Sequence, residues 1–348
     1  MENEKQYLLD FDLEELEGQM VELNEPEYRA GQIFQWIYRR RVPDFDQMSN
    51  IGKLLRIKLA EKYFILGSQP VMVRDSADGT RKMLLDFGNK VQVEAVLIPA
   101  KEHLTACLST QSGCPVKCVF CASGQGEYGG NLTAGQIAEE LLQLQILADQ
   151  TQERISNIVF MGMGEPLLNY ENTIKAIRII NSDWGLNIGA RRMTISTVGI
   201  PDKIRQLAHE KMQFNLALSL HAVDQKLREQ LIPLAKKYSL RDIFDATVYF
   251  FEKTHREVTL EYLLLKDVNC NGSDADVLAE MARTIRANVN LIVYNPTEND
   301  PFQAPTKQSV MNFLNHLKRL NVNVHMRASR GQDIEAACGQ LKHKMTKP

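Results

Sequence analysis

The 348-residue sequence predicts an α/β protein, a partial (β/α)6 barrel with a small helical N-terminal domain and a β-hairpin linker. The first observation behind this prediction is that apolar stretches alternate with helical stretches from residue 103 onward. Such alternation favours a parallel sheet with right-handed crossovers. The second observation is composition. Hydrophobic residues make up 44% of the chain and charged residues 24%, and no apolar run approaches the roughly 18 residues that a membrane span needs.

Short helices are expected in the N-terminal domain, which we place at residues 1–65. Asn24 is a candidate cap for a helix over residues 26–38, because Asn favours the N-cap and proline is tolerated near a helix start. Pro43 then ends this helical region. A second helix is expected over about residues 51–62.

The charge of the chain is unevenly distributed, although its net value is only −2. Residues 1–27 carry ten acids and one base, which argues against a secretory or mitochondrial presequence. Residues 28–63 carry eight bases and three acids around the segment FQWIYRRR. The bases are Arg29, Arg39, Arg40, Arg41, Lys53, Arg56, Lys58 and Lys62. This basic stretch is either an RNA-phosphate surface or a solvated helix face beside a core tryptophan.

A hairpin linker, residues 66–100, precedes the barrel, residues 101–348. The sequence VMVRDSADGTRKMLLDFGN predicts the hairpin, with its tight turn at Asp78–Gly79. The expected barrel strands are Thr105–Thr110, Ile155–Met161, Arg192–Thr197, Phe214–Leu220, Val258–Leu264 and Asn290–Tyr294, with a further candidate at Asn323–Ala328 after a helix over 306–320. The first barrel helix should begin at Thr133, with Gln136 completing a capping box.

Three cysteines in the segment GCPVKCVFCASG are the most specific feature of the sequence. Cys114, Cys118 and Cys121 are separated by three and then two residues. A cubane iron–sulfur cluster normally takes four cysteine ligands, and this run supplies three, which predicts a [4Fe–4S] cluster with one open iron. A structural zinc site is the alternative, but zinc would need a fourth Cys or His at a suitable spacing. The C-x3-C-x2-C run resembles the signature of radical S-adenosylmethionine (SAM) enzymes.

Polar and glycine residues follow the predicted strands, where an α/β barrel carries its chemistry. Glycine lets the backbone approach a ligand closely, and a carboxylate or neutral polar group can accept or donate hydrogen bonds to one. The candidates are Gly164, Glu165, Ser196, Ser219, His221 and Asn295. Ser219 and His221 lie two residues apart, so a strand would point both side chains to one face. Each residue alone could equally be an ordinary loop residue.

Three further cysteines lie outside the cluster loop. Cys107 is on the first predicted strand, and Cys338 follows the barrel in the segment ASRGQDIEAACGQL. The two are either buried structural thiols or a reactive pair able to meet in a thiol–disulfide cycle. Cys270, in DVNCNGSD, has no evident partner. A chain with crowded thiols suits a reducing cytoplasm better than a disulfide scaffold.

Motifs along nearly the whole chain resemble the RlmN and Cfr family of radical SAM RNA adenine methyltransferases. They are CLSTQSGCPVKCVFCASG, FMGMGEPLLN, RRMTISTVG, LALSLHA, VNLIVYNP and RGQDIEAACGQL. The resemblance implies a radical SAM barrel that methylates C2 of adenosine in RNA, at adenosine 2503 of 23S rRNA and adenosine 37 of certain tRNAs. Its cofactors would be a [4Fe–4S] cluster and SAM, two per turnover. A radical route is chemically reasonable, because adenine C2 is electron-poor and the cofactor carries the hard chemistry.

The resemblance also implies roles for individual residues. Cys114, Cys118 and Cys121 would be the cluster ligands, and the SAM-contacting positions would be Gly164, Glu165, Ser196, Ser219, Leu220, His221 and Asn295. Cys338 would be methylated first and would then form a transient protein–RNA adduct. Cys107 would resolve that adduct through a disulfide with Cys338. Glu94 matches the position of the proton acceptor.

Two positions bear on the specificity that the resemblance implies. Many members have arginine where this chain has Gly130, and Pro166 matches the C2-methylating branch rather than the C8-methylating, Cfr-like branch. The expected partners are 23S rRNA, tRNA and a reductant such as flavodoxin or ferredoxin, with the enzyme acting as a cytoplasmic monomer and without a membrane. The alternatives are a C8 methyltransferase and, from another class, a non-catalytic iron–sulfur protein that binds RNA or transfers electrons.

Overall fold

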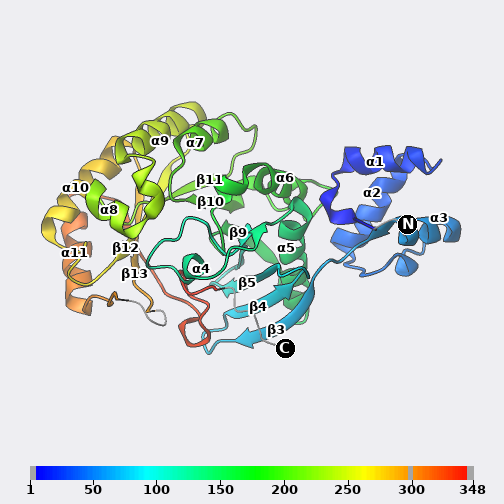
Figure 1. Ribbon diagram of the computed structural model, residues 1–348, viewed down its shortest axis with the longest axis horizontal. Coiled ribbons are helices and arrows are strands. Elements are labelled where there is room, and N and C mark those ends of the chain that lie inside the picture. The colour runs from blue at the N-terminus through cyan, green and yellow to red at the C-terminus, as the bar shows by residue number, and fades with distance from the viewer. Residues whose placement is uncertain (1–4, 297–300, 343–348) are drawn as a thin grey trace.

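The computed structural model describes residues 5–296 and 301–342, and it confirms the predicted α/β class. One mixed sheet of ten strands dominates these described residues (Figure 1). From one edge to the other its strands are β14 (Val324–Arg327), β13 (Asn288–Val293), β12 (Val258–Leu264), β11 (Asn215–Ser219), β10 (Met193–Thr197), β9 (Ile155–Phe160), β6 (Leu104–Cys107), β5 (Gln92–Pro99), β4 (Arg81–Asp86) and β3 (Gln69–Asp75).

The part of the sheet from β6 to β14 is parallel and curves into a partial barrel. The six predicted barrel strands and the further candidate are all present, with ends that shift by three residues at most. Long helices connect them and cover the outer face: α5 (Ala134–Asp149), α6 (Tyr170–Asn181), α7 (Pro201–Leu207), α9 (Leu240–Thr254), α10 (Gly272–Thr284) and α11 (Lys307–Arg319) (Figure 1). No helix in the described ranges combines the length and apolar character that crossing a bilayer requires.

Local sequence explains where these elements begin. The capping box predicted at the start of α5 is present: Thr133 accepts from the backbone N–H of Gln136, and the Gln136 side chain accepts from the N–H of Thr133. Strand β12 is buried along almost its whole length, as expected of a central parallel strand covered on both faces. It nevertheless carries one charge, Glu261, which points to a functional or paired role.

The predicted hairpin is confirmed as β3 and β4, which pair antiparallel around the turn at residues 76–80. Gly79 takes φ +84°, a conformation that glycine adopts without a steric penalty. Strand β5 continues this meander and pairs antiparallel with both β4 and β6. The linker strands therefore extend the barrel sheet directly, so that side chains on β4 and β5 lie close to the first barrel strand.

The N-terminal domain contains α1 (Leu13–Glu22), α2 (Tyr28–Phe34) and α3 (Lys53–Lys62), with the short parallel strands β1 (Gln6–Tyr7) and β2 (Tyr63–Phe64). The helix of α2 continues as one π-turn through Arg39. The predicted cap at Asn24 is wrong. The residue before α2 is Glu27, which makes no capping hydrogen bond, and Asn24 instead takes φ +59° just after α1. Asn tolerates this left-handed conformation and so ends the preceding helix.

The N-terminal domain packs against α5 and the segment after α6 (Figure 1). The buried carboxylate of Glu139 on α5 accepts from the backbone N–H groups of Gly67 at 2.7 Å and Ser68 at 2.8 Å, and from the hydroxyl of Tyr7. Phe34 stacks on Trp184 with ring centroids 4.8 Å apart. One buried acid and one aromatic stack therefore fix the small domain beside the barrel.

After β14 the chain turns back over the opening between the two ends of the sheet. We call residues 331–342, which contain Cys338, the Cys338 strap. In Figure 1 the strap, drawn in red, lies between the cyan strands β3–β5 and the yellow strands β12 and β13. Gly331 donates its backbone N–H to Asp78 at 3.0 Å, which ties the start of the strap to the hairpin turn.

Candidate active site

A cavity with about 820 Å³ of empty space, part of it open to solvent, lies at the carboxyl ends of the parallel strands. The side chains around it come from the cluster loop after β6, the loop after β9, strands β10 to β14 and the Cys338 strap. The wall includes Cys114, Cys118, Cys121, Gly164, Glu165, Ser196, Ser219, His221, Glu261, Arg327 and Cys338. The structure thus brings most of the candidate site residues to one place, where barrel enzymes carry their chemistry.

The three cysteines of the cluster loop share this wall. Gly124 allows the loop to close on itself, because a Cβ there would lie 2.9 Å from the Cα of Lys117 and 3.0 Å from the backbone nitrogen of Cys118. Burial raises the pKa of Cys114 to about 12, and raises that of Cys118 well above its usual range. Negative charge on Cys121 and Cys114 raises the pKa of Cys118 further, so the three thiols are electrostatic neighbours.

This donor set fits an iron–sulfur cluster better than a single metal ion. A structural zinc site would need a fourth Cys or His ligand, and the cluster loop supplies three cysteines. A cubane takes its cysteine ligands on different irons, so its sulfur ligands lie farther apart than those around one zinc. Thiols whose pKa is raised by burial would need a strongly cationic group to be held as thiolates.

Glu165 also lines the cavity, and its carboxylate accepts from the backbone N–H of Val198 at 2.9 Å and of Leu167 at 3.1 Å. Burial raises the pKa of this carboxyl to about 7, against the lowering effect of those hydrogen bonds. Gly164 takes φ +102°, and a Cβ there would lie 2.6 Å from that of Gln111. Protein packing alone therefore requires glycine at position 164, independently of any contact between this residue and a ligand.

Ser196 and Ser219, on neighbouring strands, lie with their hydroxyl oxygens 3.2 Å apart. The strand geometry expected to point Ser219 and His221 to one face is absent, because β11 ends at Ser219 and His221 takes φ +58°. His221 still reaches the cavity, with its ring edge-on to Phe120 at 5.0 Å. Its Nδ1 accepts from the backbone N–H of Leu263 at 3.1 Å, and burial together with a nearby arginine lowers its pKa to about 3. The ring is therefore neutral.

Leu220 and Asn295 are not on the cavity wall. Leu220 is fully buried behind it. Asn295 is buried under the Cys338 strap, where it donates to the carbonyl of Cys338 at 3.2 Å and accepts from Gln332 at 2.6 Å. It lines a second, smaller cavity on the other side of Cys338. In this structure the polar atoms of Asn295 therefore hold the strap.

Cys338 lines both cavities, and the residue is partly open to solvent although its thiol is surrounded by protein. Cys107, at the end of β6, is buried and lies outside the wall of the main cavity. Burial raises the pKa of Cys107 to about 12, negative charge on Cys338 raises it further, and Arg327 opposes both effects. Burial also raises the pKa of Cys338, again opposed by Arg327. The two cysteines are therefore electrostatic neighbours that share the influence of one guanidinium, and both are free thiols.

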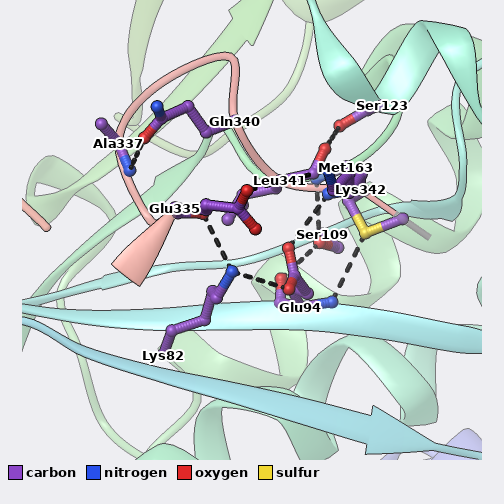
Figure 2. A network of polar contacts seen from close by, with 10 residues as sticks. All are labelled: Lys82, Glu94, Ser109, Ser123, Met163, Glu335, Ala337, Gln340, Leu341 and Lys342. Carbon is purple, nitrogen blue, oxygen red and sulfur yellow. Dashed lines mark hydrogen bonds and ion pairs between the residues drawn. The ribbon is translucent and has the colours of Figure 1, made fainter. Parts of the chain in front are cut away.

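Glu94 on β5 also lies outside the cavity wall. Its Oε1 forms a buried ion pair with Lys82 at 2.9 Å, and its Oε2 accepts from the backbone N–H of Lys342 at 3.0 Å (Figure 2).

Gly130 takes φ +117°, which an arginine rarely adopts, so this loop has a backbone that suits glycine. Pro166 is on the cavity wall.

Sequence reasoning missed three charged residues at the site. Arg228, on the short helix α8 (Gln225–Leu231), is 1% exposed and donates to the carbonyls of Leu220 at 3.1 Å, Ser219 at 3.3 Å and Val198. A helical arginine in QKLREQL resembles any surface charge, so no local signal marks it. Glu261 and Arg327 lie 3.6 Å apart. Glu261 is the one charge inside the apolar strand β12, and that contrast could have identified it. Arg327 ends the short strand β14, which also contains His325, so its sequence gives no such contrast.

The basic stretch serves partly to attach the N-terminal domain. Arg39 donates to the carbonyl of Asp183 at 2.7 Å, and Arg41 forms an ion pair with Asp149 at 3.0 Å. Arg40 lies over the exposed side of Trp36, 4.4 Å from the ring centroid. Of the three consecutive arginines, Arg40 is therefore the one whose charge is not used to join the two domains.

Comparison with known proteins agrees with this geometry. Residues 6–65 match the model of the ribosomal RNA large subunit methyltransferase N-terminal domain, and residues 108–271 match the radical SAM superfamily. A crystal structure of a radical SAM methyltransferase from Sphaerobacter thermophilus superposes with a TM-score of 0.95 at 39% identity, over 97% of this chain and 100% of that one. The fold and site therefore define a radical SAM methyltransferase, a class whose cofactors are a [4Fe–4S] cluster and SAM.

Two curated relatives make the assignment specific. Probable dual-specificity RNA methyltransferases RlmN from Thermotoga sp. (strain RQ2) and Clostridium perfringens (strain SM101 / Type A) are 44% and 45% identical, over 98% of this chain in both cases and over 98% and 97% of the relatives. The chain belongs to the RlmN family of dual-specificity RNA methyltransferases. It is an enzyme with an RNA substrate, which confirms the predicted class against the non-catalytic alternative.

Proposed function

We propose that this enzyme methylates C2 of adenosine in 23S rRNA and in tRNA, through a methyl group carried on Cys338. The observation that carries the proposal is the position of Cys338. It shares a wall with the cluster cysteines and Glu165 on one side, and it is the electrostatic neighbour of Cys107 on the other. One residue could therefore accept a methyl group from a ligand in the cavity and later be attacked by a second thiol.

The thiol chemistry can be followed on the residues of this chain. The Cys338 sulfur attacks the methyl group of one SAM, forms a carbon–sulfur bond and releases S-adenosylhomocysteine. The cluster and a second SAM, when bound, would supply the one-electron chemistry that removes a hydrogen atom from this methyl group and takes back one electron later. The carbon on Cys338 would then bond to C2, and the C2 proton would leave to Glu94. The Cys107 thiolate then attacks the Cys338 sulfur. A disulfide forms, the carbon–sulfur bond breaks, and the released carbon takes a proton to become the new methyl group.

Electrostatics support these separate roles. Cys107 lies outside the wall of the main cavity and burial raises its pKa to about 12, so Cys107 is a poor competitor for the first methyl group. Arg327 favours the thiolate at both cysteines. We propose that Cys114, Cys118 and Cys121 hold the cluster, and that Glu165, Ser196, Ser219 and His221 bind SAM with Gly164 and Leu220 beside them. The proton acceptor proposed from resemblance is Glu94.

The experiment compares two cysteine variants. Cys338→Ala has no sulfur to carry the methyl group, so it should form neither an adduct nor methyladenosine. Cys107→Ala should form the adduct but fail to resolve it, so RNA should remain covalently attached to the purified protein. Normal turnover by Cys107→Ala without bound RNA would contradict the assignment, and so would methyladenosine formed by Cys338→Ala.

The target atom is tested by digesting 23S rRNA and tRNA from cells with and without the enzyme, followed by mass spectrometry against 2-methyladenosine and 8-methyladenosine standards. We expect 2-methyladenosine, in keeping with Pro166 in the GMGEP segment. We propose action as a monomer. Six free thiols suit a reducing compartment, so we propose a cytoplasmic location, with flavodoxin or ferredoxin as reductant.

A further inference from the structure

The Cys338 strap is attached at two points, Glu335 and Lys342, to one buried ion pair. Lys82 on β4 and Glu94 on β5 lie 2.9 Å apart, and their side chains are 3% and 7% exposed. Lys82 also donates to the carbonyl of Glu335 at 2.9 Å, and Glu94 accepts from the N–H of Lys342 at 3.0 Å. The ion pair therefore closes the loop from 335 to 342, with Cys338 near its middle. Figure 2 shows this arrangement, with the pair on the sheet and the strap above it.

The middle of the strap rests on the cluster loop. The carbonyl of Gly339 accepts from the N–H of Ala122 at 2.8 Å, and the carbonyl of Leu341 accepts from the hydroxyl of Ser123 at 2.6 Å. Ala122 and Ser123 directly follow the proposed ligand Cys121. The strap thus spans from the ion pair to the cluster loop, and any movement of its ends changes the distance between the Cys338 sulfur and the main cavity.

Stability alone does not account for this ion pair. Removing two charges from water costs free energy that their attraction often fails to recover, and apolar residues of similar size can replace such pairs without loss of stability. Here each partner uses its remaining hydrogen-bonding capacity on the backbone of the strap. A donor and an acceptor at fixed positions specify one location for the strap, which apolar side chains could not do.

We propose that Lys82 and Glu94 are positioning residues, which hold Cys338 where it can accept the methyl group. The proposal rests on the proposed role of Cys338 and gives Glu94 a part in the first methyl transfer, before RNA is involved. Both carboxylate oxygens of Glu94 are engaged in this structure, one by Lys82 and one by Lys342. In contrast, a residue that served only as proton acceptor from RNA would act only after the methyl group has been transferred to Cys338.

The central test is the double variant Lys82→Met/Glu94→Leu, which removes both charges and leaves neither unpaired. In cluster-reconstituted protein we expect a melting temperature close to that of the wild type. We also expect faster amide exchange in residues 335–342, faster alkylation of Cys338 and at least a tenfold slower gain of the methyl mass on Cys338 from SAM, because small misplacements of reacting groups cost large factors in rate. Asp75→Asn, which breaks the exposed ion pair with Arg81 on the same hairpin, should leave all three rates unchanged.

The charge-exchanged variant Lys82→Glu/Glu94→Lys separates positioning from a purely structural role. It restores opposite charges but offers no donor to Glu335 and no acceptor to Lys342, so exchange should stay fast and Cys338 methylation slow. Wild-type rates of both amide exchange and Cys338 methylation would show that only the charge pair matters and would overturn the proposal.

The single variant Glu94→Gln distinguishes the proposal from the proton-acceptor role. Positioning predicts slower Cys338 methylation without RNA present. Normal Cys338 methylation and slow amide exchange in the strap, together with loss of methylated RNA, would overturn the positioning role of Glu94. If wild-type Cys338 never gains a methyl group, the proposed function fails. The positioning of the strap is then judged by amide exchange and Cys338 alkylation alone. Unchanged exchange and alkylation rates in the double variant would overturn the positioning role, and faster rates would support it.

Discussion

The raised pKa of Glu165 should make SAM binding depend on pH near neutrality. Burial raises this pKa to about 7. The ionised carboxylate is the better acceptor for the amino group of SAM, so protonation competes with binding. The apparent dissociation constant then scales with one plus the ratio of protonated to ionised carboxyl, which is about 11 at pH 6 and about 1.1 at pH 8 for a pKa near 7. Wild-type affinity should therefore be about tenfold weaker at pH 6 than at pH 8.

The assay is equilibrium binding of SAM to anaerobically reconstituted protein at both pH values, with Glu165→Gln as the matched control. Glutamine keeps the shape of the side chain but cannot ionise, and the groups of SAM itself titrate in both experiments. The ratio of wild-type to variant affinity should therefore rise about tenfold from pH 6 to pH 8. If the two affinities change in parallel, Glu165 either does not contact SAM or does not titrate in this range.

Three further changes test other parts of the structure. Arg228→Leu leaves three backbone carbonyls without their donor and should destabilise the protein by about 3 kcal/mol, at about 1 kcal/mol for each lost hydrogen bond; an unchanged melting temperature would refute this. Arg39→Ala with Arg41→Ala should speed proteolysis between the domains, whereas Arg40→Ala should weaken RNA binding and reduce its salt dependence by about one phosphate contact; the reverse pattern would contradict the assignment. Gly331→Ala places a Cβ 2.8 Å from that of Ala336 at φ +67° and should speed alkylation of Cys338; an unchanged rate would show that the strap tolerates the strain.

The barrel and the cluster loop could be predicted because their signals are local. Strand β12 begins and ends as expected, and the cap at Thr133 forms with Gln136, since each depends on a few adjacent residues. The spacing of the cysteines likewise lies within one short segment. These features require no knowledge of what packs against them.

The contacts of Glu94, Asn295 and Arg228 could not be predicted, because they join separate elements that only the fold brings together. A strand glutamate gives no sign that a lysine twelve residues earlier will face it across a turn and share a loop with it. Asn295 could have reached a ligand or the strap, and only the fold shows that it holds the strap here. The error at Asn24 has a local cause, since asparagine suits both a helix start and the left-handed residue after a helix end.

The attachment of the Cys338 strap has a consequence for how the protein folds. The hydrogen bonds that join it to the hairpin and to β4 and β5 connect residues 248 to 257 positions apart, among the longest separations in the described chain. Contacts of such long range form late, because their loop-closure entropy must be overcome before they contribute. The strap should therefore dock after the barrel has formed, and it should also be among the first segments to open when the native state fluctuates. The cysteine at the centre of the proposed reaction would then lie on the least cooperative part of a stable scaffold, where it can move without unfolding the sheet beneath it.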